Sequence, residues 1–395
     1  MTPLPPPAPL QTLVERFDHD VFDVRDRRAR VRLEVRGEGA WDVALSAGRA
    51  ELGAATDGRP DALLSADAAT WRRLTRDLRG GMTAFRSGRL RVRHDLHLGV
   101  GFLAATAQHR GRESLAFRHV ETDIAEIALM EAGAGPPVLL LHGLGATKAS
   151  FLPTVAALAQ RHRAIAVDLP GFGDSGKPLR AAYDAPFFAR AVVATLDALG
   201  LDRATIVGNS MGGRVALEVG LTTPDRVDRL VLLAPSLAWL RDRPWAPLLR
   251  LVPPQLGAVQ PAPRLVVEAI VRRLIPGGQE GWTAAGVDEF LRAYLSPRGR
   301  AAFYTAARSI YLEEPYGSNG FWTRLPALAR PALFVWGRGD RLVPRAFARH
   351  VTEALPGSEH LELTCGHVPQ LERPRETHDA ILRFLGGSAA NPAGA

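Results

Sequence analysis

Three residues in separate segments of this 395-residue chain have side chains that could act as a nucleophile, its base and the acid that orients the base. Ser210 lies in GNSMGG (208–213), a G-x-S-x-G arrangement between an apolar run at 204–207 and a helical pattern at 215–221. A sharp strand-to-helix turn presents such a serine at the end of a sheet, and flanking glycines tolerate the strained backbone of that turn. Ser210 is therefore the candidate nucleophile.

Asp340 and His367 are the candidate acid and base, because a serine hydroxyl needs a base at neutral pH and the base needs an orienting carboxylate. Asp340 follows the apolar run at 332–336, in WGRGDRLVP, and His367 follows the run at 361–363, in TCGHVPQLERP. The chain order Ser, Asp, His is one of those found in catalytic triads. We therefore expect these three residues to form one.

The segment HGLG (142–145) could supply an oxyanion hole for such a triad. It follows a continuous apolar run at 137–141, and its glycines allow backbone N–H groups to turn toward a reacting oxygen. The expected donors are the amides of Leu144 and of Met211, the residue after the nucleophile. We expect His142 to be structural, because it lies beside these donors and one base suffices.

The other polar residues near these motifs have simpler explanations. Asp168, Asp174 and Glu372 are expected to brace loops, since carboxylates at turns commonly bond nearby backbone. Cys365 is the only cysteine, which excludes an internal disulfide and a cysteine metal cluster, and the better-placed serine argues against a cysteine nucleophile. The eleven histidines show no metal-ligand spacing, so we expect no metal and no cofactor.

The elements that must position these residues are short apolar runs that alternate with helical stretches, which predicts a mostly parallel sheet with helices on both faces. The runs lie at 137–141, 164–167, 204–207, 230–233 and 332–336, with two earlier strands at 115–120 and 124–130.

About 95 residues separate the last two runs, too many for one crossover helix. We expect a helical lid over about 236–325, with helices at 265–274 and 287–295. Its aromatic residues favour an apolar substrate pocket, although any one of them could simply pack the lid onto the core.

The first part of the chain has a different organisation. Residues 28–36 alternate apolar and charged side chains, GEG (37–39) predicts a turn, and 41–45 resume the alternation, so a hairpin is expected. Asp67 could cap a helix, and 89–93 return to a strand pattern. This predicts a small α+β domain over 20–110, after a Pro-rich segment at 1–19. The prolines of its first ten residues, MTPLPPPAPL, are expected to break any helix there.

Two resemblances follow from these motifs. Residues 115–386 resemble the α/β-hydrolase family, whose motifs match in order and spacing: HGLG, DLPGFGDS (168–175), GNSMGG, WGRGDRLVP and CGHVPQLERP. About residues 20–108 resemble the sterol carrier protein family, through the hairpin, PDALLSADAATWRRL and AFRSGRLRVRHDLHLGVGFLA. The resemblances imply an α/β-hydrolase fold with a helical lid and a preceding α+β domain with an apolar tunnel. The composition of the last residues, GGSAANPAGA, predicts a flexible tail at 387–395.

The expected function is a serine hydrolase of carboxylic esters or thioesters with an apolar, lipid-like or acyl substrate. Serine at 210 argues against haloalkane dehalogenases and epoxide hydrolases, which use aspartate in this family. GNSMGG also occurs in carbon–carbon bond hydrolases, but those tend to carry Trp where this chain has Val368. Perhydrolase or acyltransferase activity would use the same triad, and a lipid-binding carrier protein is a hypothesis from a different functional class.

The net charge of +8 does not by itself indicate a nucleic-acid partner. Lys148 and Lys177 are the only lysines, so the excess reflects arginine in an Arg-rich, Ala-rich chain. Residues 1–120 carry +5 and the rest +3, which assigns any weak attraction to an anionic lipid surface to the N-terminal domain. Without a signal sequence or an apolar span, we expect a cytoplasmic protein, and nothing indicates its oligomeric state.

Overall fold

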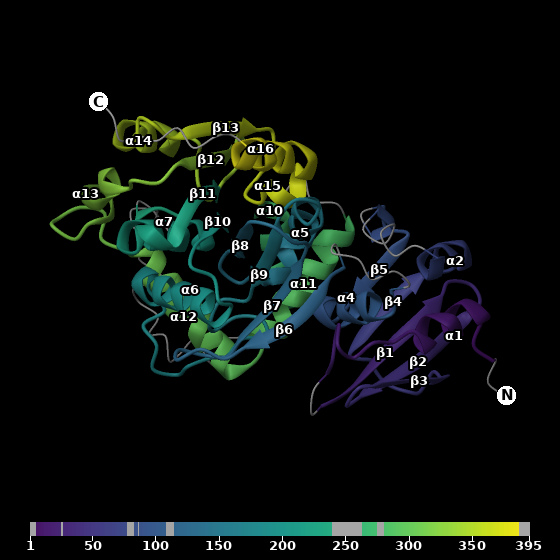
Figure 1. Cartoon of the computed structure of the whole chain (residues 1–395). Helices are drawn as coiled ribbons and strands as arrows, with labels where there is room; N and C mark the ends of the chain where they lie inside the picture. The colour runs from purple at the N-terminus through teal and green to yellow at the C-terminus, as the bar shows by residue number, and fades with distance from the viewer. Residues whose placement is uncertain are drawn as a thin grey trace.

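The computed structural model describes residues 5–24, 27–76, 83–85, 87–107, 114–238, 263–274 and 280–386. They form two units that lie side by side (Figure 1): an N-terminal unit (described residues 5–107) with a five-stranded sheet, and a hydrolase unit (described residues 114–386) with an eight-stranded sheet. Residues 108–113, between the two units, and the tail expected at 387–395 lie outside the described residues.

The N-terminal unit confirms the predicted strands and helix cap. Its sheet has the order β3-β2-β1-β4-β5. The strands are β1 (Arg28–Val35), β2 (Gly39–Ser46), β3 (Arg49–Ala54), β4 (Ala62–Ala66) and β5 (Leu90–Arg93). Alternate β1 residues are buried, and the Asp67 carboxylate accepts the Thr70 N–H at 2.7 Å at the start of α2 (Ala68–Arg76). A further helix, α4 (Leu96–Ala105), begins at Asp95.

The expectation that prolines break any helix in the first ten residues is wrong. Helix α1 (Ala8–Glu15) begins after most of the prolines, and Pro9 lies in its first turn, where a missing N–H costs no hydrogen bond. Leu10 and Leu13 are fully buried in the core of the N-terminal unit. Residues 8–15 are therefore part of that unit.

The large sheet has the order β13-β12-β11-β10-β8-β9-β7-β6, and only β7 runs antiparallel to its neighbours. Its strands are β6 (Ala116–Val120), β7 (Ile127–Ala132), β8 (Pro137–Leu141), β9 (Arg163–Val167), β10 (Ala204–Asn209), β11 (Val227–Leu233), β12 (Ala332–Gly337) and β13 (Glu359–Leu363). The predicted mostly parallel sheet is confirmed.

Helices cover both faces of this sheet, as predicted. One apolar cluster includes α5 (Leu152–Leu158) and α16 (Pro374–Gly386), and another includes α6 (Ala185–Ala198), α7 (Met211–Thr222) and α14 (Phe347–Ala354). Short helical turns complete the unit: η1 (Lys148–Phe151), η2 (Pro224–Arg226), η4 (Leu325–Ala327) and α15 (Pro369–Glu372).

The lid region between β11 and β12 contains helices, as expected. They are α10 (Arg264–Leu274), α11 (Glu280–Tyr294), α12 (Pro297–Tyr311) and α13 (Phe321–Arg324). The helix expected at 287–295 therefore begins earlier, at Glu280. Residues 239–262 and 275–279, which include Trp239 and Trp245, lie outside the described residues.

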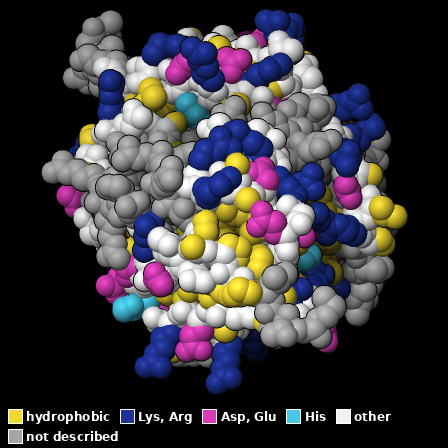
Figure 2. All heavy atoms as spheres, turned by 90° about the vertical axis from the view of Figure 1, so that its right-hand side faces the viewer, with side chains coloured by type: hydrophobic (Ala, Val, Ile, Leu, Met, Phe, Trp, Pro, Cys, Tyr) yellow, Lys and Arg dark blue, Asp and Glu magenta, His cyan; other side chains and the backbone are white. Residues whose placement is uncertain are grey.

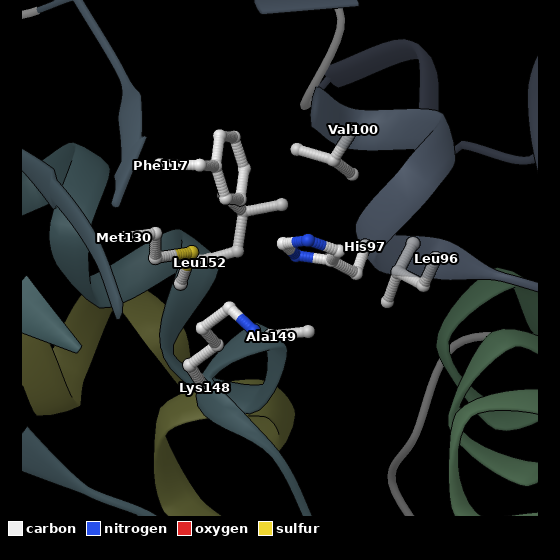
Figure 3. Close-up of a pocket in the computed structure, with 8 residues that line it drawn as sticks. All are labelled: Leu96, His97, Val100, Phe117, Met130, Lys148, Ala149 and Leu152. Atoms are coloured by element: carbon white, nitrogen blue, oxygen red, sulfur yellow. The ribbon is translucent and has the colours of Figure 1, made fainter. Parts of the chain in front are cut away.

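The two units share one continuous apolar cluster, which runs from the N-terminal sheet to one face of the large sheet. At the contact, the ring of His97 on α4 lies between Phe22 and Phe117, with centroid distances of 5.3 and 5.0 Å. A small cavity remains between the units, and the His97 ring points into it (Figure 3). Its lining residues are Leu96, His97, Val100, Phe117, Met130, Lys148, Ala149 and Leu152.

Asp95 caps α4 beside this cavity, where its carboxylate accepts the Leu98 N–H at 2.8 Å. Burial and, to a lesser extent, the nearby carboxylates of Glu289 and Asp174 raise the pKa of Asp95 to about 6, against the attraction of Arg292. A carboxyl group with a raised folded-state pKa stabilises the fold below its unfolded pKa, and this contribution is lost as the pH rises through 6.

Replacing Asp95 by Asn keeps a side-chain cap for α4 and removes this titration. We compare the free energy of unfolding of Asp95→Asn with that of the wild type. As the pH rises from 5 to 8, we expect this difference to shift in favour of the variant by on the order of 1–2 kcal/mol. Urea unfolding at the two pH values measures this change. Asp225→Asn is the control, because Asp225 is 96% exposed. If the free energy of unfolding of Asp95→Asn differs from that of the wild type by the same amount at both pH values, the prediction is contradicted.

Candidate active site

Ser210 lies at the turn where β10 ends and α7 begins. Its φ of 54° is in the left-handed region, which is strained for a residue with a side chain. Gly208 makes this turn possible, since a Cβ there would lie 2.2 Å from the Gly212 carbonyl oxygen. The sequence pattern predicted this geometry, and the structure places the Ser210 side chain at the carboxyl edge of the large sheet.

Asp340 and His367 come together at the same edge. The His367 Nδ1 and the Asp340 Oδ2 lie 2.7 Å apart, and both side chains are buried. The other Asp340 oxygen accepts the N–H groups of Leu342 and Val343, at 2.8 and 2.9 Å, which fixes the carboxylate. The His367 Nε2 is buried and has no hydrogen-bond partner among the described residues. This ring nitrogen is free to accept a proton.

Glu372 holds the loop that carries His367. Its carboxylate accepts the N–H groups of Gly366 and Val368, at 2.9 and 3.1 Å, on either side of the histidine. This confirms the bracing role expected for Glu372. Burial raises the pKa of the nearby Cys365 thiol to about 12, so this cysteine remains a thiol rather than a nucleophilic thiolate.

The Ser210 hydroxyl bonds to Ser236 rather than to His367. Its Oγ lies 3.1 Å from Ser236 Oγ, and the Tyr311 hydroxyl interacts with both serines. No hydrogen bond joins Ser210 to His367 in the described part of the chain. Catalytic hydrogen bonds are often long or poorly aligned without a substrate, so the absence of this bond does not argue against the triad.

Sequence reasoning missed Ser236 and Tyr311. Ser236 follows β11, the strand next to β10, and a polar residue just past the end of that strand was an available signal. Tyr311 ends the lid helix α12, where no local pattern indicates which residue reaches the nucleophile. The ion pair between Arg214 on α7 and Glu313 holds this end of the lid. Burial raises the pKa of Tyr311 to about 12, so the phenol keeps its proton.

The HGLG loop lies against the nucleophile. A Cβ on Gly143 would lie 3.2 Å from the Ser210 Cβ, and the Ala146 N–H donates to the Gly143 carbonyl at 3.0 Å, which makes Leu144 and Gly145 the centre of a turn. The other expected donor, the Met211 N–H, opens α7, and the Ser210 side chain does not cap this helix. Both expected oxyanion donors thus flank the serine.

His142 connects the HGLG loop to the next loop of the site. Its Nε2 accepts the Leu169 N–H at 3.0 Å, so its Nδ1 carries the proton and donates to the Gly143 carbonyl at 2.8 Å. Burial lowers the pKa of His142, which keeps the ring neutral. Both ring nitrogens are used, which confirms a structural role.

Asp168 and Asp174 also brace loops, as expected. Asp168 accepts the Lys148 N–H at 2.7 Å and the Lys148 ammonium at 2.6 Å, and Asp174 accepts the same ammonium at 2.9 Å. All three groups are buried or nearly so, and the two carboxylates hold the pKa of Lys148 above its ordinary value despite burial. This ion cluster fixes the chain three residues beyond the HGLG loop.

Two aromatic rings of the lid cover the same loop. Phe290 on α11 and Phe303 on α12 pack edge to face, with centroids 5.7 Å apart. A Cβ on Gly145 would lie 2.7 Å from Phe290 and 3.0 Å from Phe303. The lid therefore gives the HGLG loop an apolar cover.

Within the described residues, three side chains of types that can bind a metal ion lie close together at one place. Asp18, His19 and Asp20 lie close together in the N-terminal unit, and the last two are exposed. They do not belong to the residues around Ser210.

Gly145 is the position at which the loop and lid constrain each other most closely. Its φ of +73° disfavours any side chain, and an added methyl group would meet Phe290. We expect Gly145→Ala to lower the free energy of unfolding by about 1–3 kcal/mol. Gly357→Ala is the matched control, because a Cβ there meets nothing within 4 Å. Chemical denaturation of both variants measures the effect, and equal losses would refute it.

Comparison with known proteins agrees with this geometry. The alpha/beta hydrolase fold family model matches residues 136–374, and the SCP-2 sterol transfer family model matches residues 20–103.

Two curated relatives match about two thirds of this chain. The 2-hydroxy-6-oxononadienedioate/2-hydroxy-6-oxononatrienedioate hydrolase of Paraburkholderia phymatum is 31% identical over 278 residues, which cover 65% of this chain and 89% of that protein. The pimeloyl-[acyl-carrier protein] methyl ester esterase of Aeromonas hydrophila is 29% identical over 264 residues, with 66% and 99% covered.

A solved structure described as a membrane phospholipase A, a bacterial virulence factor, is 28% identical and has a TM-score of 0.59. It covers 80% of this chain and 96% of its own. None of the helices in the described ranges is long and apolar enough to cross a membrane. The fold, the motifs and the family models together show that this chain belongs to the α/β-hydrolase family and carries an N-terminal SCP-2-like domain.

Proposed function

We propose that this protein is a serine hydrolase of carboxylic esters or thioesters with an apolar acyl substrate, and that Ser210, His367 and Asp340 are its triad. The observation that carries the proposal is the state of His367. One ring nitrogen is held by Asp340 at 2.7 Å, and the other is buried, without a hydrogen-bond partner among the described residues, and at the same edge of the sheet as Ser210. A general base that awaits the proton of a nucleophile has this arrangement.

The proposed reaction starts when the Ser210 hydroxyl leaves Ser236 and Tyr311 and turns to His367. His367 takes the proton as Ser210 attacks the acyl carbon, and Asp340 holds the imidazole in its working tautomer. The amides of Leu144 and Met211 would stabilise the tetrahedral oxyanion. His367 then returns the proton to the leaving alcohol or thiol, and a water molecule releases the acyl group by the same steps.

An apolar substrate is supported by the surroundings of the site. Phe290 and Phe303 cover the oxyanion loop, and relatives include an esterase of an acyl-carrier methyl ester and a membrane phospholipase A. The SCP-2 match and the outer face of the N-terminal unit favour a lipid partner. Figure 2 shows Lys and Arg side chains around an area of hydrophobic side chains on that side of the molecule. We propose weak contact of this face with anionic lipid.

Carbon–carbon bond hydrolysis is the second candidate, because a 31% identical relative is a 2-hydroxy-6-oxononadienedioate hydrolase. Perhydrolase or acyltransferase activity would use the same triad. A lipid-binding carrier protein is the alternative from another class, and it would not need Ser210.

The triad is tested with a fluorophosphonate probe and a chromogenic ester. We expect Ser210→Ala to abolish labelling and Asp340→Asn to lower kcat by about 10⁴-fold, because the base loses its orienting carboxylate. Ser236→Ala is the control for a neighbouring hydroxyl and should still be labelled. Labelling or turnover above background in Ser210→Ala would sink the proposal.

The substrate class is tested by a chain-length series of p-nitrophenyl esters beside a 2-hydroxy-6-oxo-dienoate. We expect kcat/KM to rise with acyl length by at least about tenfold from C2 to C8, since each buried methylene contributes about 0.8 kcal/mol. Faster turnover of the dienoate than of any ester would favour carbon–carbon bond hydrolysis. If neither is turned over while Ser210→Ala binds fatty acid as the wild type does, the carrier alternative holds.

A further inference from the structure

Lid helix α11 contacts the N-terminal unit through charged groups on one face. Asp288 is 1% exposed, and its carboxylate accepts Arg93 Nε at 2.6 Å and the His94 N–H at 3.0 Å, both from the N-terminal unit. The other Asp288 oxygen pairs with Arg264 of α10 at 2.5 Å. If α11 moved and Asp288 lost one of these donors, part of its buried negative charge would have no partner. Because such a charge is costly, the contact holds α11 in place.

One turn further along α11, Arg292 joins three parts of the chain. It bonds Asp174 of the hydrolase unit at 2.7 Å and Glu289 of its own helix at 2.7 Å, and its Nε lies 3.6 Å from Asp95 of the N-terminal unit. Asp174 in turn bonds the ammonium of Lys148, just after the HGLG loop. Charged groups thus connect the N-terminal unit, α11 and the end of the oxyanion loop.

The opposite face of α11 contacts the oxyanion loop directly. Residues 288 and 292 lie about 160–200° around a helix from residue 290, so Phe290 points away from the charged face. Its ring packs against Gly145, next to the expected donor Leu144, and stacks on Tyr294 at 5.0 Å. Figure 1 shows α11 beside α4 and β5, the elements of the N-terminal unit that it contacts.

We propose that the N-terminal unit positions the oxyanion loop through α11, with Arg93, Asp288 and Arg292 as positioning residues. The inference rests on the proposed function for its catalytic consequence. In this proposal, the SCP-2-like domain also contributes to the turnover of substrates that no lipid carrier has to deliver to the site. A shift of α11 moves Phe290, which packs on Gly145, together with Arg292, which is connected to Lys148 through Asp174. Misplacement of an oxyanion donor by a fraction of an ångström is enough to slow acyl transfer.

The test compares Arg93→Gln with Arg272→Gln in the full-length protein. Both variants remove an arginine that pairs with a lid helix, but Arg272 pairs with Glu268 within α10, at 2.9 Å, and is 68% exposed, whereas Arg93 is 35% exposed. Amide hydrogen exchange of residues 142–148 and 280–294 is measured, together with kcat and KM for p-nitrophenyl acetate. This substrate is small and soluble, so a loss cannot come from lipid delivery.

We expect Arg93→Gln to speed exchange in both segments and to lower kcat about 10- to 100-fold with little change in KM. Arg272→Gln should match the wild type, and Arg93→Lys should recover part of kcat. Unchanged exchange at 142–148, an effect on KM alone, or an equal loss in Arg272→Gln would overturn the proposal. If Arg93→Gln does not fold, Arg93→Lys is compared in the same way and should show a smaller loss in the same direction.

These outcomes separate the two proposals. If the wild-type protein hydrolyses no ester, the proposed function fails, and the exchange measurement alone decides the positioning role because it needs no substrate. If the wild type is active and exchange at 142–148 does not respond to Arg93, the positioning role fails while the proposed function stands.

Discussion

Neighbouring parallel strands of the large sheet end at one edge, and each candidate active-site group follows one of those ends. The HGLG loop follows β8, Ser210 follows β10 and Ser236 follows β11, while Asp340 and His367 follow β12 and β13. The hydrogen-bonded register of the strands therefore brings together residues from separate segments between 142 and 367, without any local signal that links them. Loops braced by buried carboxylates then set the final geometry.

The buried charges have a second role, because they join parts of the chain that apolar packing alone would hold less specifically. The chain just beyond the HGLG loop is held by an ion cluster of Lys148, Asp168 and Asp174. Arg292 extends this cluster to the lid and toward the N-terminal unit. Buried ion pairs contribute little net stability, but they penalise every arrangement that leaves one partner alone. The lid and the N-terminal unit are in this way connected to the edge of the sheet that carries Ser210.

The repeating patterns of the sequence predicted most of the fold. Alternation in β1, the continuous apolar runs of β8 to β12 and the glycines around Ser210 each follow from local backbone geometry, so short windows were sufficient. The prolines at the start of the chain predict no helix, but only Pro9 lies in α1, in its first turn, where a missing N–H costs no hydrogen bond. Helix α11 was predicted to begin too late, because its apolar spacing is clear only from Val287 onward.

The candidate site was predictable where it depends on motifs and unpredictable where it depends on packing. Ser210, Asp340, His367 and the HGLG loop lie at strand ends, which a sequence pattern can locate. Ser236 and Tyr311 reach Ser210 only through the pairing of β10 with β11 and the placement of α12, and the Arg93 to Asp288 contact joins residues 195 positions apart. Contacts of this kind depend on tertiary structure and leave no local signature.

A crystal structure of the protein after reaction with a fluorophosphonate tests the proposed triad and oxyanion hole most directly. We expect phosphorus bonded to Ser210 Oγ, the phosphoryl oxygen within hydrogen-bond distance of the Leu144 and Met211 amides, and His367 Nε2 beside the modified serine. A phosphonate on another residue, or a phosphoryl oxygen bound by Ser236 and Tyr311 with the two amides unused, would contradict it.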